Sequence, residues 1–506
     1  MNRVLRSTGL LPPLVVVLLS LWGAVLVILL LSAGKLYSLP MVLATAFPVA
    51  LYASRNPRLF FLVGMVGTAA LGLSINFNRH VHIGGAPSYS IDAMDLFMVP
   101  LLVFMVRDFA MGYRKEIRLS WLSLWWVGLM ALGMWNVVAG PYREFAAFET
   151  FRMFKCWLLF LVIINECVRE RHFHHVMMAL AGGLVLNIVI ALLQFALKRS
   201  LGLEALGEPA PEAVLGANYG VYLGAGAVYR VSGLVGHPNL FAAYLAMLLP
   251  IYIGLLFTDY KWSMKALIAL LSGFGLLALV LTLSRTGWAA FAAATLALGF
   301  VVVAHPTLRG QHVKLKATMA MLLVVGAVAA AGPIITRLTH SDSGALDFRY
   351  EWLGVAWKMV QDKPVFGHGL NTFTYQIVDF SPYSVGKMME LFGPVWPVVH
   401  NTYFLVWAEQ GTVGLFFFLA LHVHVIWLAF QNGRYMHSSR ISMTSVGAVC
   451  GIVAIMVDGM GSFFQRVPAP DRIFWIVVGL IVAAHYWNVA NDPLRRRMAR
   501  PALQPI

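Results

Sequence analysis

Long apolar segments alternate with short polar segments along nearly the whole chain. Segments of bilayer length lie near residues 12–32, 39–53, 59–75, 91–106, 119–139, 151–168, 174–197, 238–257, 264–284, 286–304, 317–335, 402–430, 443–463 and 473–488. A helix of about 20 apolar residues crosses the hydrocarbon core of a bilayer. The pattern therefore predicts an all-α polytopic membrane protein of about 14 transmembrane helices, without a sizeable water-soluble domain.

The composition agrees with a membrane protein. Of the 506 residues, 60% are hydrophobic and 12% are charged, which is about half the charged fraction of an ordinary soluble domain. Cys156, Cys167 and Cys450 lie in apolar segments without metal-ligand spacing, so they are interpreted as small core residues. The net charge of +15 is divided among the segments between spans. This distribution argues against the continuous basic face of a nucleic-acid-binding protein.

Basic residues predict the orientation of the spans. Short loops rich in Lys and Arg stay in the cytoplasm, and the C-terminal tail holds Arg495, Arg496, Arg497 and Arg500. Counting back from this tail puts each short basic loop, and the N-terminal Arg3 and Arg6, on the same side. Both termini are therefore expected to be cytoplasmic. The long loops at about 198–236 and 336–400 then face the periplasm, and the second of them precedes the twelfth span.

Two arginines on the predicted periplasmic side are the first candidate site residues. Arg285 lies in a break so short that its guanidinium group must sit at or within the membrane surface. An ionisable group there indicates function, although an arginine that snorkels at a helix end is the alternative. Arg349 begins a segment in which Trp352, Val355 and Met359 recur at helical spacing. This spacing predicts an amphipathic helix lying on the membrane.

Two histidines precede predicted helices on the same side. His400 is followed by Asn401, a good capping residue, and a helix N-terminus attracts anions. A histidine can also accept a proton near neutral pH. His237 precedes Pro238 and Asn239 in the same arrangement. A purely structural capping role is the alternative for both histidines.

The ligand expected from these residues is an anion. Arg230, Arg285 and Arg349 lie on one predicted face with the two histidines, and guanidinium groups bind phosphate oxygens in bidentate fashion. A lipid diphosphate fits this set best. The predicted periplasmic loops contain no metal-binding motif.

Four acidic residues lie in or next to predicted spans. Asp92 and Asp95 share one helix face, where capping explains Asp92 equally well. Glu409 and Asp458 lie within spans, so each is expected to face the bundle interior and have a partner.

Four runs of residues resemble the O-antigen ligase and O-antigen polymerase family. They are RVSGLVGHPNLFAAYL, LTLSRTGWAAF, FRYEWLGVAWKMVQDKPVFGHGLNTF and VVHNTYFLVWAEQGTVGL, in this order between about residues 230 and 419. The resemblance divides the chain into N-terminal spans with the first long loop (1–229), a ligase- or polymerase-like core (230–430) and C-terminal spans with a basic tail (431–506).

The resemblance implies a metal-independent, inverting glycosyltransferase without a cofactor. Its donor would be a glycan on undecaprenyl diphosphate, bound at the periplasmic face of the bacterial inner membrane. Arg285 and Arg349 would hold the diphosphate, and His400 would assist the acceptor or the departing group. The substrate contacts assigned on this basis are Arg230, His237, Asn239, Asn401 and Tyr350.

The number of spans favours polymerisation of repeat units in a surface polysaccharide. The alternative is a ligase that transfers the glycan to lipid A-core or to a protein hydroxyl. Expected partners are the lipid-linked donor, a glycan or lipid acceptor, membrane lipids and, as a candidate, a chain-length regulator, with no nucleic acid. A polysaccharide or lipid transporter ranks lower, because the halves of the chain show no similarity to each other.

Overall fold

The computed structural model of the chain describes residues 51, 54, 56–80, 82–209, 220–223, 226–310, 312–318, 321, 332, 335, 345–393, 396–434 and 439–491. The chain divides into two units, residues 1–61 and 62–506. Little of the first unit beyond the start of α4 (Pro57–Thr68) is described. The fold and the site below belong to the second unit.

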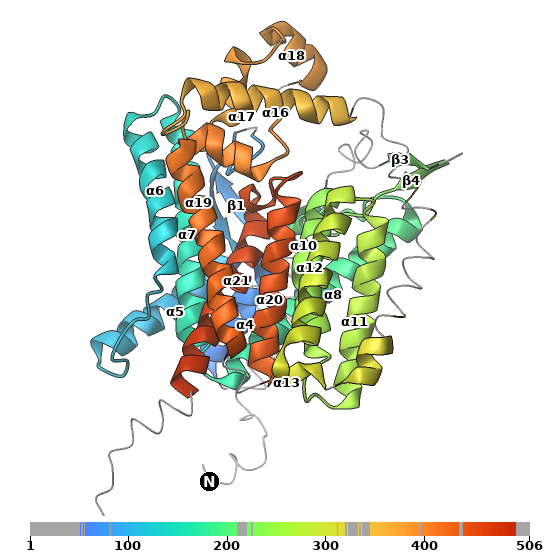
Figure 1. Cartoon of the computed structure of the whole chain (residues 1–506). Coiled ribbons are helices and arrows are strands. Elements are labelled where there is room, and N and C mark those ends of the chain that lie inside the picture. The colour runs from blue at the N-terminus through green and yellow to red at the C-terminus, as the bar shows by residue number, and fades with distance from the viewer. Residues whose placement is uncertain are drawn as a thin grey trace, which may run out of the picture. The chain divides into compact units, whose positions relative to one another are not determined.

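Eight helices of the described part are long and apolar enough to cross a membrane. They are α6 (Leu122–Ala139), α8 (Glu170–Leu197), α10 (Pro238–Leu255), α11 (Trp262–Leu281), α12 (Arg285–Ala304), α19 (Thr402–Arg434), α20 (Ser439–Asp458) and α21 (Pro468–Asn491). Each overlaps a span expected from the hydrophobic pattern (Figure 1). The prediction of a multi-pass helical membrane protein is thereby confirmed.

The other predicted spans differ in their outcome. The segment 59–75 becomes the short α4, and 91–106 and 151–168 become α5 (Ala93–Ala110) and α7 (Arg143–Glu166), which contain more charged residues than the eight helices above. The spans predicted at 12–32, 39–53 and 317–335 lie largely outside the described residues, as do both termini. The total of fourteen and the orientation of the ends therefore stay predictions.

The chain is not exclusively helical, which corrects the all-α expectation. β1 (Ser74–Phe77) pairs antiparallel with β2 (Tyr89–Asp92), and β3 (Gly220–Leu223) pairs with β4 (Gly226–Tyr229). The alternation of polar and apolar residues in Ser-Ile-Asn-Phe is typical of a strand. The remaining short elements are η1 (Glu204–Leu206), α13 (Pro306–Arg309), α17 (Phe373–Gln376), η2 (Ile377–Asp379), α18 (Val385–Phe392) and η3 (Phe464–Arg466).

Helix α10 is buried along nearly its whole length against α12 and α20. Glycines permit this close packing. A Cβ added at Gly447 of α20 would lie 2.5 Å from the Cα of Ile251, and one at Gly451 would overlap the carbonyl of Met247. Small residues at helix contacts let backbones approach within membranes, where apolar surface alone drives little association.

Helix α7 carries charges that are buried and paired. Arg152 bonds Glu149 at 2.6 Å and also pairs with Asp471 of α21. Lys155 pairs with Asp92 and, at 2.8 Å, with Asp95. Because each charge has an opposite partner, α7 is stable inside the bundle although its sequence is unusually polar.

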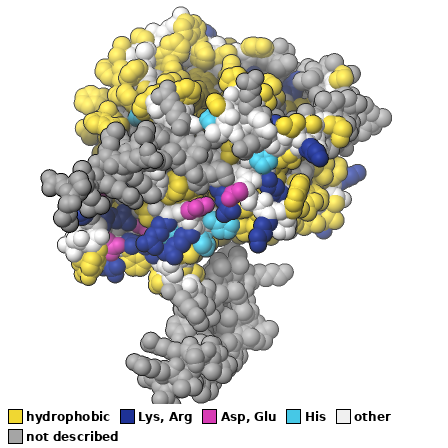
Figure 2. Space-filling view, turned by 60° about the horizontal axis from the view of Figure 1, so that its bottom comes forward, with side chains coloured by type: hydrophobic (Ala, Val, Ile, Leu, Met, Phe, Trp, Pro, Cys, Tyr) yellow, Lys and Arg dark blue, Asp and Glu magenta, His cyan; other side chains and the backbone are white. Residues whose placement is uncertain are grey.

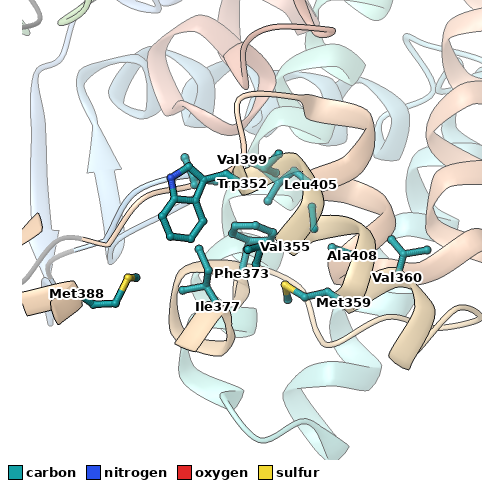
Figure 3. Close-up of a cluster of buried hydrophobic side chains, with 12 residues drawn as sticks. Trp352, Val355, Met359, Val360, Phe373, Ile377, Met388, Val399, Leu405 and Ala408 are labelled. Carbon is teal, nitrogen blue, oxygen red and sulfur yellow. The ribbon is translucent and has the colours of Figure 1, made fainter. Parts of the chain in front are cut away.

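Helix α16 (Ala345–Asp362) lies across the ends of the upright helices in Figure 1 and contacts α19. Its buried face forms a cluster with residues of α17 and α19, shown in Figure 3. Trp352, Val355 and Met359 belong to this cluster, whereas Tyr350 is 71% exposed. The predicted amphipathic helix is confirmed, and its contact with a membrane surface stays a prediction.

A break in α19 receives the loop that follows α16. Gly411 has φ 65° and ψ −169°, a combination that is essentially restricted to glycine. The amides of His368 and Gly369 bond the carbonyls of Ala408 and Glu409 at 2.9 and 2.8 Å. The loop therefore satisfies carbonyls of α19 on the N-terminal side of its break.

We expect Gly411→Ala to prevent stable folding. The added Cβ would overlap the carbonyl of Val365, and the backbone strain alone costs on the order of 1–3 kcal/mol. The matched control is Gly433→Ala in the same helix, where a Cβ meets nothing within 4 Å. Thermal unfolding in detergent, together with the amount of protein in membranes, measures the effect. Equal stability of the two variants would contradict the prediction.

Candidate functional site

A cavity of about 450 Å³ opens among residues from six separated parts of the chain. Its walls come from the β1–β2 hairpin and its loop, from the start of α10 and the segment before it, from His400 before α19, from the segment between α20 and α21, and from the single residues Arg152 and Gly207. Among its lining residues are Arg79, His82, His237, Asn239, His400 and Arg466. All six parts belong to loops or to ends of spans that the expected alternation of spans assigns to one side of the membrane.

His400 is held in one tautomer. Its Nδ1 lies 3.1 Å from the carbonyl oxygen of Val398, and a carbonyl can only accept, so Nδ1 carries the proton. Nε2 then has a lone pair, and no hydrogen bond to it forms among the described residues. Burial and the nearby Arg349 lower the pKa of His400 to about 4. The imidazole is therefore neutral at pH 7 and able to accept a proton through Nε2.

Arg230, His237 and Asn239 lie together at the start of α10. The Asn239 amide donates to Nδ1 of His237, as a helix cap does, at 3.1 Å. Arg230 donates to the side-chain oxygen of Asn239 at 2.6 Å and to the carbonyl of Thr282 at 2.8 Å. Burial, then Arg230, His400 and Arg349, lower the pKa of His237 to about 3. The structure thus brings the predicted residues before α10 and before α19 into one electrostatic group.

Arg349 and Arg285 are not among the residues that line the cavity. Arg349, in α16, is close enough to both histidines to lower their pKa values. Arg285 is the first residue of α12, directly after a break in which Leu283 adopts φ 53°. The next residue, Thr286, is where a Cβ at Gly461 would make contact, at 2.5 Å. The short break expected at Arg285 is confirmed.

The two carboxylates within spans are buried as expected. Glu409 accepts hydrogen bonds from the amides of Asn371 and Phe373 at 3.0 and 3.1 Å, and it pairs with Arg466. Asp458, at the end of α20, is fully buried beside the hydroxyl groups of Thr286 and Ser462. Asp458 therefore lies beside Thr286, the residue that follows Arg285, and it is not among the residues that line the cavity.

Asn401 and Tyr350 occupy other surroundings. The Asn401 side chain caps α19 by accepting from the amides of Tyr403 and Phe404, at 3.0 and 3.1 Å. This geometry supports the capping interpretation of Asn401. Tyr350 is 71% exposed and is absent from the cavity wall. A substrate contact by either residue stays a prediction.

Three residues of the site's framework, His82, Asn371 and Arg466, are not predicted by the sequence patterns. The side-chain amide of Asn371 donates to the carbonyls of Ala86 and Phe145, at 2.9 and 3.0 Å, and its oxygen lies 2.6 Å from His82 Nε2. Arg466 donates to the carbonyl of Gly84 at 3.1 Å. These bonds join segments hundreds of residues apart, so no local pattern in one sequence reveals them.

Asp92 and Asp95 begin α5 and form a capping box there. With Lys155 beside both carboxylates, this pair is a helix cap and an ion-pair site. No group of three or more His, Cys, Asp or Glu side chains that could hold a metal occurs in the described ranges.

A second, smaller cavity of about 320 Å³ lies among residues assigned to the opposite side of the membrane. Arg440 stacks over Tyr260 at 4.5 Å and pairs with Asp259 at 2.9 Å. Figure 2 shows this end of the molecule, where basic, acidic and histidine side chains gather. The two cavities are therefore lined by different sets of loops. This agrees with the expected alternation of loops between the two sides of the membrane.

The fold and the first cavity define a multi-pass membrane protein with arginines and histidines gathered around one cavity. The family model described as O-antigen ligase matches residues 266–419. The match covers Arg285, Arg349 and His400, and it confirms the resemblance to the O-antigen ligase and polymerase family. No curated protein matches the chain significantly. Arg230, His237 and Asn239 lie outside the matched region. They are connected to it through the hydrogen bond from Arg230 to the carbonyl of Thr282.

Proposed function

We propose that this protein is a glycosyltransferase that uses a glycan linked to a lipid diphosphate and acts at the periplasmic face of the bacterial inner membrane. The observation that carries the proposal is the position of His400 at the cavity. Its Nδ1 is bonded to a backbone carbonyl, and its Nε2 forms no hydrogen bond with a described residue. Arg349 and His237 lie close enough to interact with it electrostatically. An anion-binding group beside a neutral base matches the requirements of transfer from a diphosphate donor.

The reaction follows from the charges that must be stabilised. An acceptor hydroxyl attacks the anomeric carbon while the bond from that carbon to the diphosphate oxygen breaks. His400 takes the hydroxyl proton at Nε2, and the bonding electrons leave with the diphosphate. Arg285 and Arg349 stabilise the charge that develops on its oxygens. Attack opposite the departing diphosphate inverts the anomeric configuration.

Bound donor makes His400 a stronger base. In the free protein Arg349 contributes to the low pKa of the imidazole. A diphosphate bound to Arg349 neutralises this positive charge and adds a negative one. Both changes favour the imidazolium form, so the pKa of His400 rises when donor is present. Proton transfer is thereby coupled to occupation of the donor site.

We place polymerisation of repeat units first and ligation to lipid A-core or a protein hydroxyl second. Both reactions use the same donor chemistry and differ in the acceptor. A distribution of glycan chain lengths in cells distinguishes them: loss of long chains indicates a polymerase, whereas lipid-linked chains that remain unattached indicate a ligase.

We expect Arg349→Ala to weaken donor binding by about 10-fold or more, since a charge-assisted bond contributes roughly 1.5–3 kcal/mol. Arg349→Lys keeps the charge but not the bidentate geometry, so its effect is intermediate. Binding of a labelled lipid-diphosphate glycan to protein in nanodiscs measures both. The control is Lys358→Ala, an exposed cation on the same helix. Unchanged donor affinity in Arg349→Ala would overturn its assigned role.

A further inference from the structure

One wall of the cavity is an amphipathic hairpin formed by β1 and β2. In its register Ser74 faces Asp92, Asn76 faces Ser90, and Ile75 faces Ile91. Side chains alternate between the two faces of a strand pair. Ser74, Asn76 and Ser90 line the cavity, so the hairpin turns its polar face inward.

The other face of the hairpin is apolar and uncovered. Ile75 is 64% exposed, Phe77 is 50% exposed and Ile91 is 46% exposed. Exposed apolar side chains on a strand pair would favour aggregation in water, but in a bilayer they contact lipid tails. The hairpin therefore has a polar face toward the cavity and an apolar face suited to contact with lipid tails.

Arg79, in the loop between the strands, differs from the other arginines of the cavity wall. Arg152, Arg466 and Arg472 are buried and form ion pairs with carboxylates. Arg79 is exposed, lines the cavity and forms no hydrogen bond or ion pair with any described residue. Its positive charge is available to a ligand.

Arg79 is also separate from the proposed diphosphate site. Arg349 lowers the pKa values of His237 and His400, and Arg79 contributes to neither shift. The loop that carries Arg79 is held in place, because the Asn78 side chain donates to Glu144 at the start of α7 and His80 lies 3.5 Å from the same carboxylate. Arg79 lines the cavity, whereas Arg285 and Arg349 are not among its lining residues, so Arg79 is a separate centre of positive charge.

We propose that the hairpin wall is the acceptor subsite, which rests on the proposed function. Ser74, Asn76 and Ser90 hydrogen-bond hydroxyl groups of the acceptor sugar, and Arg79 binds a phosphate group near the acceptor's lipid anchor. The anchor stays in the bilayer along Ile75, Phe77 and Ile91. This arrangement presents the acceptor hydroxyl to the donor diphosphate.

Two acceptors share this chemistry, a second lipid-diphosphate glycan and phosphorylated lipid A-core. The test uses full-length protein in nanodiscs with a labelled donor and each acceptor in turn. We expect Arg79→Ala to raise KM for the active acceptor by about 10-fold or more and to leave donor affinity unchanged within about twofold. Arg79→Glu should raise this KM further through repulsion. The acceptor whose KM responds identifies the source of the phosphate.

The matched control is Arg143→Ala, an exposed arginine at the start of α7 that lies outside the cavity wall. An acceptor KM in Arg79→Ala equal to that of the wild type, or an equal loss of donor affinity, would overturn the subsite. If the wild type transfers no glycan, the proposed function fails. Equilibrium binding of each labelled acceptor to the wild type and to Arg79→Ala then still decides the subsite.

Discussion

Replacing His400 with alanine is expected to reduce glycan transfer by about 10²–10⁴-fold, the usual contribution of a general base. The variant loses Nε2, the ring nitrogen to which no described residue forms a hydrogen bond, while the arginines proposed to hold the donor remain. Donor affinity should therefore change little while turnover falls. Transfer is measured with purified protein and a lipid-diphosphate glycan, and donor accumulation is measured in cells.

His400→Asn separates proton transfer from structure. Its side-chain amide can replace the Nδ1 donor to the carbonyl of Val398, but it has no basic atom in the position of Nε2. It should be as inactive as the alanine variant and as stable as the wild type. His174→Ala, an exposed histidine at the second cavity, serves as the control. Substantial activity in His400→Asn would limit His400 to a positioning role.

The pH dependence of the glycan-transfer rate is an independent test of the role of His400. With its pKa lowered to about 4, His400 is neutral above that value, and protonation below it removes the base. The rate with limiting donor should therefore fall as the pH decreases through this range. Bound donor raises the pKa, so the profile with saturating donor should turn down at a higher pH. A rate that increases with acidity would instead require the protonated imidazole.

The edge of the site could be predicted from sequence because its residues stand at helix ends. Arg285 and His400 lie at abrupt changes from polar to apolar sequence, and such changes mark the membrane surface where loops from one side meet. Helical spacing likewise predicted the amphipathic helix α16. In each case a local pattern had a direct structural consequence.

The hairpin wall could not be predicted in the same way. The strands at residues 74–77 and 89–92 overlap the ends of the spans expected at 59–75 and 91–106, so the hydrophobic pattern does not separate them from those spans. Their alternation over four residues was the available signal. Asn371 and Arg466 gave none, because each acts through bonds to segments distant in sequence. Tyr350 shows that closeness in sequence to a candidate residue does not predict a place in the site. It follows Arg349 directly but lies on the exposed face of the helix.

Glu409→Gln is expected to destabilise the protein by about 3–5 kcal/mol, the usual effect of removing one partner from a buried ion pair. The carboxylate accepts from the amides of Asn371 and Phe373 and pairs with Arg466. A glutamine can direct only one oxygen at these donors, and its own amide would face another donor. Among the described residues, the buried Arg466 would keep only Glu149 as an anionic partner.

The consequence should extend to the cavity, although Glu409 is not part of its wall. Arg466 holds the carbonyl of Gly84, and Asn371 holds that of Ala86, so Glu409 indirectly fixes the loop that carries Arg79. Thermal unfolding in detergent should show a large loss of stability, with activity falling in parallel. Glu390→Gln, which affects an exposed pair with Lys387, should change stability by less than about 1 kcal/mol. A fully stable but inactive Glu409→Gln would instead place this carboxylate in the chemistry itself.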